Sequence, residues 1–275
     1  ICLSMLATDM VVKQKNGEDW KINVDDVEEV FFEEKANIPD DSTVVDVSET
    51  FLRFNILSDS TVEVTRESND DLTYIGHDTI TIPEKVRIDG KIYTVKSIGR
   101  CAFGGCVSVT NINIPKSVTD IGELAFSDCL SLTSIEIPEG VTSIGEYAFS
   151  DCSSLASIDI PESVTSIGWY AFNGCSGLTS INIPKDVKEI GYSAFKGCSS
   201  LTSIQIPEGL TSIEGSVFSG CNSLITLQIP ESVTNIGQYA FMDCSGLTSI
   251  NIPESVTSIG ASVFWGCSSL ASIYI

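Results

Sequence analysis

The chain has 275 residues, of which 43% are hydrophobic, so it holds enough apolar material for one large core or two. It carries 37 acidic and 15 basic residues, and its formal charge is −22. This charge argues against binding to nucleic acid or anionic lipid, because both require clustered Lys and Arg, and it favours basic partners. No apolar run in the sequence is long enough to span a bilayer.

The chain begins with the apolar stretch ICLSMLA and has no initiating methionine. We interpret residues 1–7 as the end of the hydrophobic region of a signal peptide, with cleavage near Ala7. The alternative is the apolar start of a cytosolic protein. The first interpretation predicts that the protein is secreted or lies on the bacterial cell surface.

Residues 8–50 predict a small β-rich N-terminal module that ends in a linker. Asn16-Gly17 lies between alternating residues in MVVKQKNGEDWKINV, a pattern typical of a β-hairpin. The segment VEEVFFEE, residues 27–34, is a candidate third strand. Residues 36–44 contain Asn, Pro, Asp and Ser in close succession, which indicates the linker.

Residues 51–79 are expected to cap the part of the chain that follows them. The segment ETFLRFNILSDSTVEV supplies strand-forming residues here. The one histidine of the chain, His77, is expected to be a surface or cap residue.

From residue 80 to residue 275 the sequence repeats itself. LTSIEIPEGVTSIGEYAFSDC, from Leu132 to Cys152, is followed by LASIDIPESVTSIGWYAFNGC, from Leu155 to Cys175. Cysteine, proline and phenylalanine all recur at a period of 23 residues, in one common register. The cysteines of this register are Cys106, Cys129, Cys152, Cys175, Cys198, Cys221, Cys244 and Cys267. Such a period predicts a solenoid, in which each coil buries the apolar side chains of its neighbour.

Each repeat predicts the same short elements. The opening L-x-x-I-x-I alternates as a strand does, and the proline after it ends the strand because it has no N–H to donate. Val and Ile of V-T-S-I-G then point inward, and the glycine permits a bend. The segment Y-A-F-x-x-C is too short for a full helix and predicts one turn of 3₁₀ or α structure. The Gly or Asp before each cysteine suits a residue with positive φ.

Two places depart from the regular repeat. Pro83 precedes Pro115 by 32 residues, nine more than one period, and the excess contains RIDGKIYTV, residues 87–95. Its Asp89-Gly90 pair predicts a hairpin inserted in the first coil. The repeat TSIEGSVF places Glu214 where the glycine belongs, so we expect a local irregularity there.

The unit L-x-x-I-x-I-P…V-T-S-I-G-x-x-A-F-x-x-C resembles the 23-residue repeats of BspA-like bacterial surface proteins, within the leucine-rich-repeat superfamily. The resemblance covers residues 80–275. It implies a mainly β, right-handed leucine-rich-repeat solenoid with short 3₁₀ or helical turns. It also implies a non-enzymatic protein that binds host matrix proteins or other bacteria.

The cysteine column has two functional interpretations, a metal array and a set of disulfides. Zinc sites use C-x-x-C pairs or added histidines, whereas the one close pair here is Cys101 and Cys106. Disulfides between coils are unfavourable because stacked side chains stay about one coil apart. We therefore expect the cysteines to act as small buried hydrophobic residues, with no metal and no cofactor.

The first candidate binding surface is the row of residues that point outward from the main strands. Such a long, regular face is often the binding face of a leucine-rich repeat, and the alternative is a solvated ladder whose amides bond one another. The row consists of Asn113, Glu136, Asp159, Asn182, Gln205, Gln228 and Asn251.

The second candidate surface is an aromatic flank at the variable pair of residues after each I-G. Tyrosine and tryptophan are enriched in interface hot spots, and they also stack on sugars. The alternative is that these rings pack on neighbouring coils. The flank consists of Tyr147, Trp169, Tyr170 and Tyr192.

No catalytic motif is evident, because the sequence has neither a G-x-S-x-G elbow nor a phosphate-binding glycine motif. Two functions therefore stay open, a module that binds protein or glycan partners and a structural spacer that displays another module. The last residues, ASIYI, predict a strand without a polar cap, and such an edge would allow self-association.

Overall fold

The structure is a computed structural model that describes residues 9–13, 19–23, 43–66 and 77–275. It divides into two units, Ile1–Ser42 and Thr43–Ile275. In the first unit, β1 (Asp9–Lys13) and β2 (Asp19–Asn23) pair in an antiparallel hairpin, as the sequence predicts. The proposed signal-peptide end at 1–7, the third strand at 27–34 and residues 36–42 of the linker lie outside the described residues.

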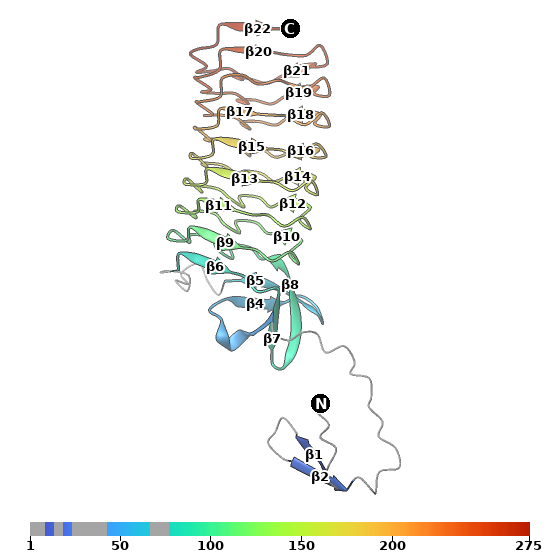
Figure 1. The fold of residues 1–275 in the computed structure, drawn as a ribbon. Helices are drawn as coiled ribbons and strands as arrows, with labels where there is room; N and C mark the ends of the chain where they lie inside the picture. Colours follow the sequence, from blue (N-terminus) through green and yellow to red (C-terminus); the bar gives the residue numbers. More distant parts are fainter. Residues whose placement is uncertain (1–8, 14–18, 24–42, 67–76) are drawn as a thin grey trace. The chain divides into compact units, whose positions relative to one another are not determined.

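The second unit is a stack of coils, and nearly every coil contributes one strand to a first row of parallel strands (Figure 1). The coil at residues 224–229 contributes a single bridge, between Gln228 and Asn251. Residues in this row pair with residues 23 positions away, as Ser157 does with Ser180. The strands are β6 (Thr79–Thr81), β9 (Asn111–Asn113), β11 (Ser134–Ile135), β13 (Ser157–Asp159), β15 (Ser180–Asn182), β17 (Ser203–Ile204), β20 (Ser249–Asn251) and β22 (Ser272–Tyr274). The predicted fold class, a mainly β leucine-rich-repeat solenoid, is confirmed.

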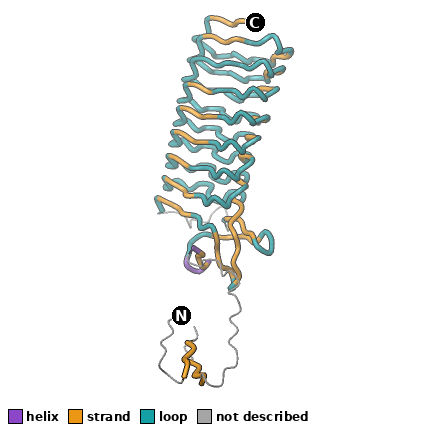
Figure 2. Tube along the Cα trace, turned by 45° about the vertical axis from the view of Figure 1, so that its right-hand side comes forward, coloured by secondary structure: helices purple, strands orange, loops and turns teal. Residues whose placement is uncertain are grey.

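The V-T-S-I-G segments form a second row of parallel strands. Along each coil, loops separate the strand of the first row from the strand of the second (Figure 2). The second row again pairs residues 23 apart, as Ser143 with Ser166. The strands are β8 (Lys91–Ile98), β10 (Asp120–Ile121), β12 (Ser143–Ile144), β14 (Ser166–Ile167), β16 (Glu189–Ile190), β18 (Ser212–Ile213), β19 (Asn235–Ile236) and β21 (Ser258–Ile259).

The Y-A-F-x-x-C segment forms the third side of each coil, and its hydrogen bonding differs from the 3₁₀ or α turn that the sequence predicts. In residues 147–152, alternate N–H groups donate to the next coil, and the others donate to carbonyls three residues earlier. Phe149 N–H donates to Ala171 O at 2.8 Å, whereas Ser150 N–H donates to Tyr147 O at 3.0 Å. A 3₁₀ helix would bond every residue locally, so the segment is a series of turns.

Two residues in each of these turns have positive φ. One is the Gly or Asp before the cysteine, as the sequence predicts. The other is the second variable residue after I-G, whose φ lies between 54° and 60° although none of these residues is glycine. This second set is Cys101, Leu124, Tyr147, Tyr170, Ser193, Ser216, Tyr239 and Ser262.

The core runs along the whole stack and consists of identical side chains in register. The phenylalanine rings from Phe103 to Phe264 stack on one another with centroids 5.1–5.9 Å apart. The inward Leu, Ile, Val, Ala and Cys of the repeats are buried beside them, except in the last coil, where Ile259 and Ile273 are exposed. Each coil therefore covers the apolar face of the next.

The first coil carries the hairpin that Asp89-Gly90 indicates. There β7 (Lys85–Ile88) and β8 pair antiparallel, and both turn residues have positive φ. β3 (Val44–Asp46) pairs with β7 and is followed by a short 3₁₀ helix, η3 (Val47–Glu49).

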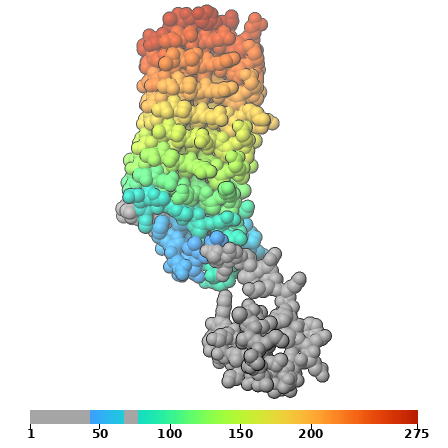
Figure 3. Space-filling view, viewed as in Figure 1, coloured from blue at the N-terminus to red at the C-terminus, as the bar shows by residue number. Residues whose placement is uncertain are grey.

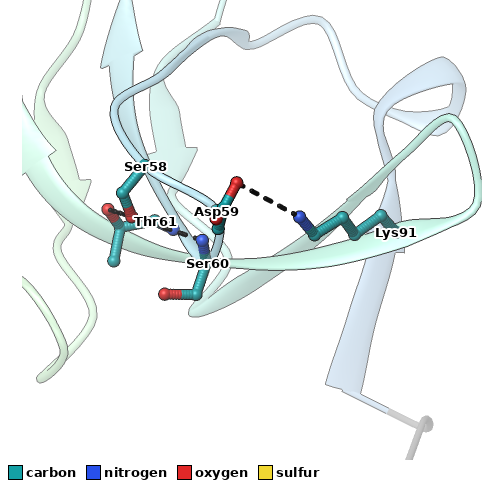
Figure 4. Close-up of polar contacts among 5 residues, drawn as sticks. All are labelled: Ser58, Asp59, Ser60, Thr61 and Lys91. Carbon is teal, nitrogen blue, oxygen red and sulfur yellow. Dashed lines mark hydrogen bonds and ion pairs between the residues drawn. The ribbon is translucent and has the colours of Figure 1, made fainter.

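β4 (Arg53–Ile56) and β5 (Thr61–Thr65) form an antiparallel hairpin, and β5 pairs in parallel with β8. Figure 4 shows its turn, where the hydroxyls of Ser58 and Thr61 hydrogen-bond at 2.7 Å and Asp59 forms an ion pair with Lys91. Leu52, Val62 and Val64 are buried in the same core as the repeats. This packing supports our proposal that residues 51–79 cap the solenoid.

The irregularity expected at Glu214 is present and is local. At most other coils the residue in this position donates its N–H to the previous coil, as Gly191 does to Ile167 O at 2.9 Å. Among the described residues, Glu214 makes no such bond, and β16 does not pair with β18. The turn bonds across this step remain, including Phe195 N–H to Val217 O at 3.0 Å, so the stack continues.

Candidate functional site

The row of outward residues on the first strands is a continuous polar surface. All seven side chains from Asn113 to Asn251 are exposed. The parallel register brings them together, because Asp159 pairs with Asn182, and single bridges join Glu136 to Asp159 and Gln228 to Asn251. In Figure 3 the coils that carry the row follow one another in sequence order from cyan to red.

Most of these side chains have no polar partner in the part of the chain that the structure describes. Asn113 donates from Nδ2 to Thr81 Oγ1 at 3.1 Å, at the start of the row. Across the rest of the described row, from Glu136 to Asn251, no side chain hydrogen-bonds another. The expected ladder of mutually bonded amides is therefore restricted to the first coil, and the remaining carboxylates and amides are available to a partner.

Two adjoining hollows lie along this row. The larger has a volume of about 760 Å³ and is lined by three successive coils, from Asn111 to Glu162. The smaller has a volume of about 400 Å³ and is lined by residues of β13, β15 and β17. Both include Ser157, Ile158 and Asp159, so together they form one groove across five coils.

The coils around the larger hollow are strongly acidic. Residues 117–184 contain nine carboxylates and no Lys or Arg. Glu123 pairs with Arg100 of the previous coil, and it is the one carboxylate of this stretch in an ion pair among the described residues. The nine are Asp120, Glu123, Asp128, Glu136, Glu139, Glu146, Asp151, Asp159 and Glu162.

The tyrosines of the aromatic flank pack on neighbouring coils. The rings of Tyr147 and Tyr170 stack with centroids 4.6 Å apart, and Tyr192 meets Tyr170 edge-on at 5.6 Å. Desolvation raises the pKa of Tyr147, and the neighbouring Tyr170 and Glu146 raise it further. All three phenols are half-buried, which is the packing role that the sequence left open.

Trp169 differs from the tyrosines because 54% of its surface is exposed. Its ring lies against the next coil, where a Cβ atom at Gly191 would be only 2.4 Å from Trp169 Cδ1. In the same way, a Cβ atom at Gly215 would be 2.8 Å from Cε2 of Tyr192. The Trp169 ring therefore packs against Gly191 of the next coil, and much of its surface remains exposed to a partner.

The cysteine column has the structural role that the sequence predicts. The described cysteines are free thiols, and those from Cys129 to Cys244 are fully buried. Burial raises the pKa of Cys175 and of Cys244 to about 12, so these thiols stay protonated at neutral pH. Among the described residues, no group of three or more His, Cys, Asp or Glu could hold a metal ion.

The sequence did not predict the hydrogen bonds that these thiols make. Cys175 Sγ donates to Phe149 O at 3.0 Å, and the same carbonyl accepts the Cys152 N–H at 3.3 Å. The thiol therefore satisfies the second lone pair of a buried carbonyl. The signal was available, since the cysteine follows the phenylalanine of the previous coil by a constant 26 residues.

Sequence reasoning also missed Ser193, which is fully buried among the aromatic residues of the flank. Its hydroxyl has no hydrogen-bond partner among the described residues. Ser216 occupies the same position one coil later, and its hydroxyl bonds Tyr192 Oη at 3.3 Å. The repeat pattern alone does not distinguish these two serines.

Among the described residues, no helix combines the length and hydrophobicity that a bilayer-spanning segment requires.

Comparison with known families and structures finds one family and several related folds. Residues 84–202 and 170–275 match the family described as "BspA type Leucine rich repeat region (6 copies)". A comparison with curated proteins finds no match.

Two solved structures resemble the chain closely. A leucine-rich repeat protein from Bacteroides ovatus ATCC 8483 is 36% identical over 82% of this chain, with a TM-score of 0.69. The T. pallidum leucine-rich repeat protein is 32% identical over 80% of this chain, with a TM-score of 0.61. The matched regions span 63% of the Bacteroides protein and 88% of the T. pallidum protein.

Proposed function

This chain belongs to the BspA-type leucine-rich-repeat family, and from that premise we propose that it is a non-enzymatic binding module. It acts in adhesion, secreted or displayed on the bacterial cell surface, and it presents a rigid repeat face to protein or glycan partners. Leucine-rich repeats stack into long, regular surfaces that are suited to protein binding.

The observation that carries this proposal is the exposed, unpartnered row from Glu136 to Asn251 on parallel strands. Its backbone is fixed by ladder bonds and by the stacked phenylalanine core, so binding would cost little ordering entropy. The row also lines a groove, which increases the area that a partner can bury.

The described residues favour a binding module over an enzyme. His77 stacks on Phe51 with the ring centroids 4.0 Å apart, which gives it a packing partner in the cap. The thiols from Cys129 to Cys244 are buried, and burial raises the pKa of Cys175 to about 12, which keeps this thiol protonated and weakly nucleophilic at neutral pH. An enzyme would need convergent polar groups in a deep pocket, whereas the groove here is shallow and repetitive.

The second candidate function, a spacer that displays another module, is favoured by one observation. Tyr147, Tyr170 and Tyr192 pack on each other across coils, which is what a purely structural flank would do. The exposed Trp169 is the feature that a spacer does not explain.

A binding screen against immobilised matrix proteins and a glycan array tests the proposal. Trp169→Ala/Tyr170→Ala is measured beside the wild type, with circular dichroism as the check on folding. We expect the wild type to bind at least one partner and the folded double variant to bind it about tenfold more weakly, as for a central aromatic hot spot. Tyr239→Ala/Trp265→Ala is the matched control, because it removes two exposed aromatic rings elsewhere on the solenoid.

Equal binding by both double variants and the wild type would exclude the aromatic flank and leave the strand-face row or the N-terminal module as the site. No binding by the wild type to any partner would contradict the binding module and favour the spacer.

A further inference from the structure

The groove on the first strands has one acidic end and one neutral end. Glu136 and Asp159 extend from the strands into the larger hollow, and Glu139 and Glu162 line it just after the prolines. Lys116 is the one basic residue in the lining of this hollow. The lining of the smaller hollow beyond Asp159 consists of serine, isoleucine, Asn182 and Gln205.

The four carboxylates of the larger hollow outnumber its one cation, Lys116, and Lys116 pairs with none of them among the described residues. None is in an ion pair among the described residues, and their own coils contain no Lys or Arg from residue 117 to residue 184. The backbones that carry these carboxylates on successive coils lie about 4.8 Å apart, so their like charges repel. A cationic partner would relieve this repulsion, and the field of the acidic coils would attract it.

The shape of the groove favours a linear partner. Its two hollows share three residues and follow the stack across five coils, so a chain lying along the groove would contact all of them. The long, flexible side chains of lysine and arginine can reach carboxylates on neighbouring coils. The amides of Asn182 and Gln205 offer both donors and acceptors to a peptide backbone further along.

We propose that this groove binds an extended, Lys- and Arg-rich segment of a protein partner. The carboxylates of Glu136, Glu139, Asp159 and Glu162 pair with its cations, and the neutral end of the groove bonds its backbone. This inference rests on the proposed function, since it names the chemistry of the partner that the repeat face recognises.

The test uses a variant whose new residues already occur at the same position in other coils. Glu136→Gln/Asp159→Asn places in these coils the residues that the same row already carries at Gln205 and Asn182, so folding is expected to be unchanged. The probe is a fluorescein-labelled peptide of twelve residues that alternates lysine and serine, and the readout is fluorescence anisotropy. We expect the variant to bind this peptide at least tenfold more weakly than the wild type, and the wild type to bind more weakly as salt is added.

The matched control is Glu208→Gln/Glu231→Gln. This variant also removes two negative charges, but Glu208 and Glu231 follow the prolines of coils that do not line the hollow. We expect it to bind the peptide as tightly as the wild type does. Equal weakening by both double variants would show that only net charge matters, and it would overturn the inference. Equal binding of a glutamate–serine peptide by the wild type would also overturn it.

The outcome separates this inference from the proposed function. If Glu136→Gln/Asp159→Asn keeps full binding to a protein partner found in the screen, the groove inference is wrong and the binding module stands. If the lysine–serine peptide binds and depends on Glu136 and Asp159 while the screen finds no partner, the groove inference holds and adhesion to the screened partners is wrong.

Discussion

Ser193 shows how identical positions in a repeat can differ in energy. Its hydroxyl is buried without a partner, whereas Ser216 in the next coil has the same backbone conformation and a hydrogen bond to Tyr192. A buried hydroxyl without a partner has lost its bonds to water and gained none.

We expect Ser193→Ala to raise the free energy of unfolding by about 1 kcal/mol, because it removes an unsatisfied buried hydroxyl without changing the backbone. Urea denaturation measures the change. Ser216→Ala is the control, and it is expected to be neutral or to destabilise by about 1 kcal/mol because it breaks a hydrogen bond. A stabilising effect of the same size in both variants would contradict this explanation.

Individual residue roles were predictable where one residue type explains the position. The sequence indicated that the column cysteines are buried hydrophobic residues, that Pro ends the strand, and that Gly or Asp has positive φ. Positive φ at Tyr147, Tyr170 and Tyr239 was not predictable, since tyrosine has no preference for that conformation. The bonds from the next coil impose it.

Close approach of coils explains why the I-G glycine recurs in the second row of strands. A Cβ atom at Gly145 would lie 2.7 Å from the backbone carbon and oxygen of Gly122. Where Glu214 takes this position, β16 and β18 do not pair and one inter-coil bond is lost. The natural sequence thus contains one example of the substitution and its local cost.

We expect Gly145→Ala to destabilise the protein by about 2–3 kcal/mol, since it forces β10 and β12 apart in the middle of the stack. Hydrogen exchange should show faster exchange at the amides of Gly145 and its neighbours. Gly209→Ala is the control, because a Cβ atom there would come no closer than 3.9 Å to another atom. Equal stability losses in the two variants would show that close approach is not the cause.

The strands were predictable from alternation and the turns were only partly so. Local sequence reasoning assigned Y-A-F-x-x-C to 3₁₀ or α structure because it considers bonds within one coil. In the structure every second N–H of this segment donates to a carbonyl of the next coil, as that of Phe149 does, and forms no local bond. The sequence of a single repeat gives no information on bonds between coils. The sequence likewise predicted that the aromatic residues of the flank form a cluster. It did not predict that Trp169 is more exposed than the tyrosines, because their exposure depends on how the rings pack on one another across coils.

The buried thiol column gives the whole molecule a predictable response to alkaline pH. Burial raises the pKa of Cys175 from 9.0 to about 12, and burial raises the pKa of Cys198 and Cys221 well above its ordinary value. The unfolded chain therefore loses thiol protons before the folded chain does. The stability that each protonated thiol contributes is complete below pH 9 and is lost as the pH rises towards 12.

We expect the free energy of unfolding to fall above pH 9 by about 1.4 kcal/mol per pH unit for each buried thiol. Urea denaturation from about pH 8 to about pH 10, roughly one unit on either side of the free thiol pKa, measures the slope with a reductant present. Cys175→Ala should reduce the slope of the unfolding free energy against pH by the contribution of one thiol, about 1.4 kcal/mol per pH unit. An unchanged slope in this variant would mean that other groups cause the pH dependence.

At the scale of the molecule, the 23-residue period predicted a stack of coils. The stack in turn predicted that the residues from Asn113 to Asn251 form one exposed row. The groove was not predictable, because its two hollows depend on how the coils are placed and not on residue identity. The acidic character of residues 117–184 was visible in the sequence, but its meaning depends on which carboxylates face the groove.

The alternating turn bonds also give the solenoid an electrical polarity. Every inter-coil bond of the turns runs the same way, from an N–H such as that of Phe126 to a carbonyl in the following coil, here Ala148. The peptide dipoles of this face therefore add along the stack, as they do in a helix, with their positive ends towards the later coils. Residues 197–275 contain five carboxylates and no Lys or Arg. The fixed charges of those coils thus oppose the field of this one face. The inter-coil bonds beside the strand rows also oppose it, because they run the other way, as from Thr133 N–H to Thr110 O of the previous coil.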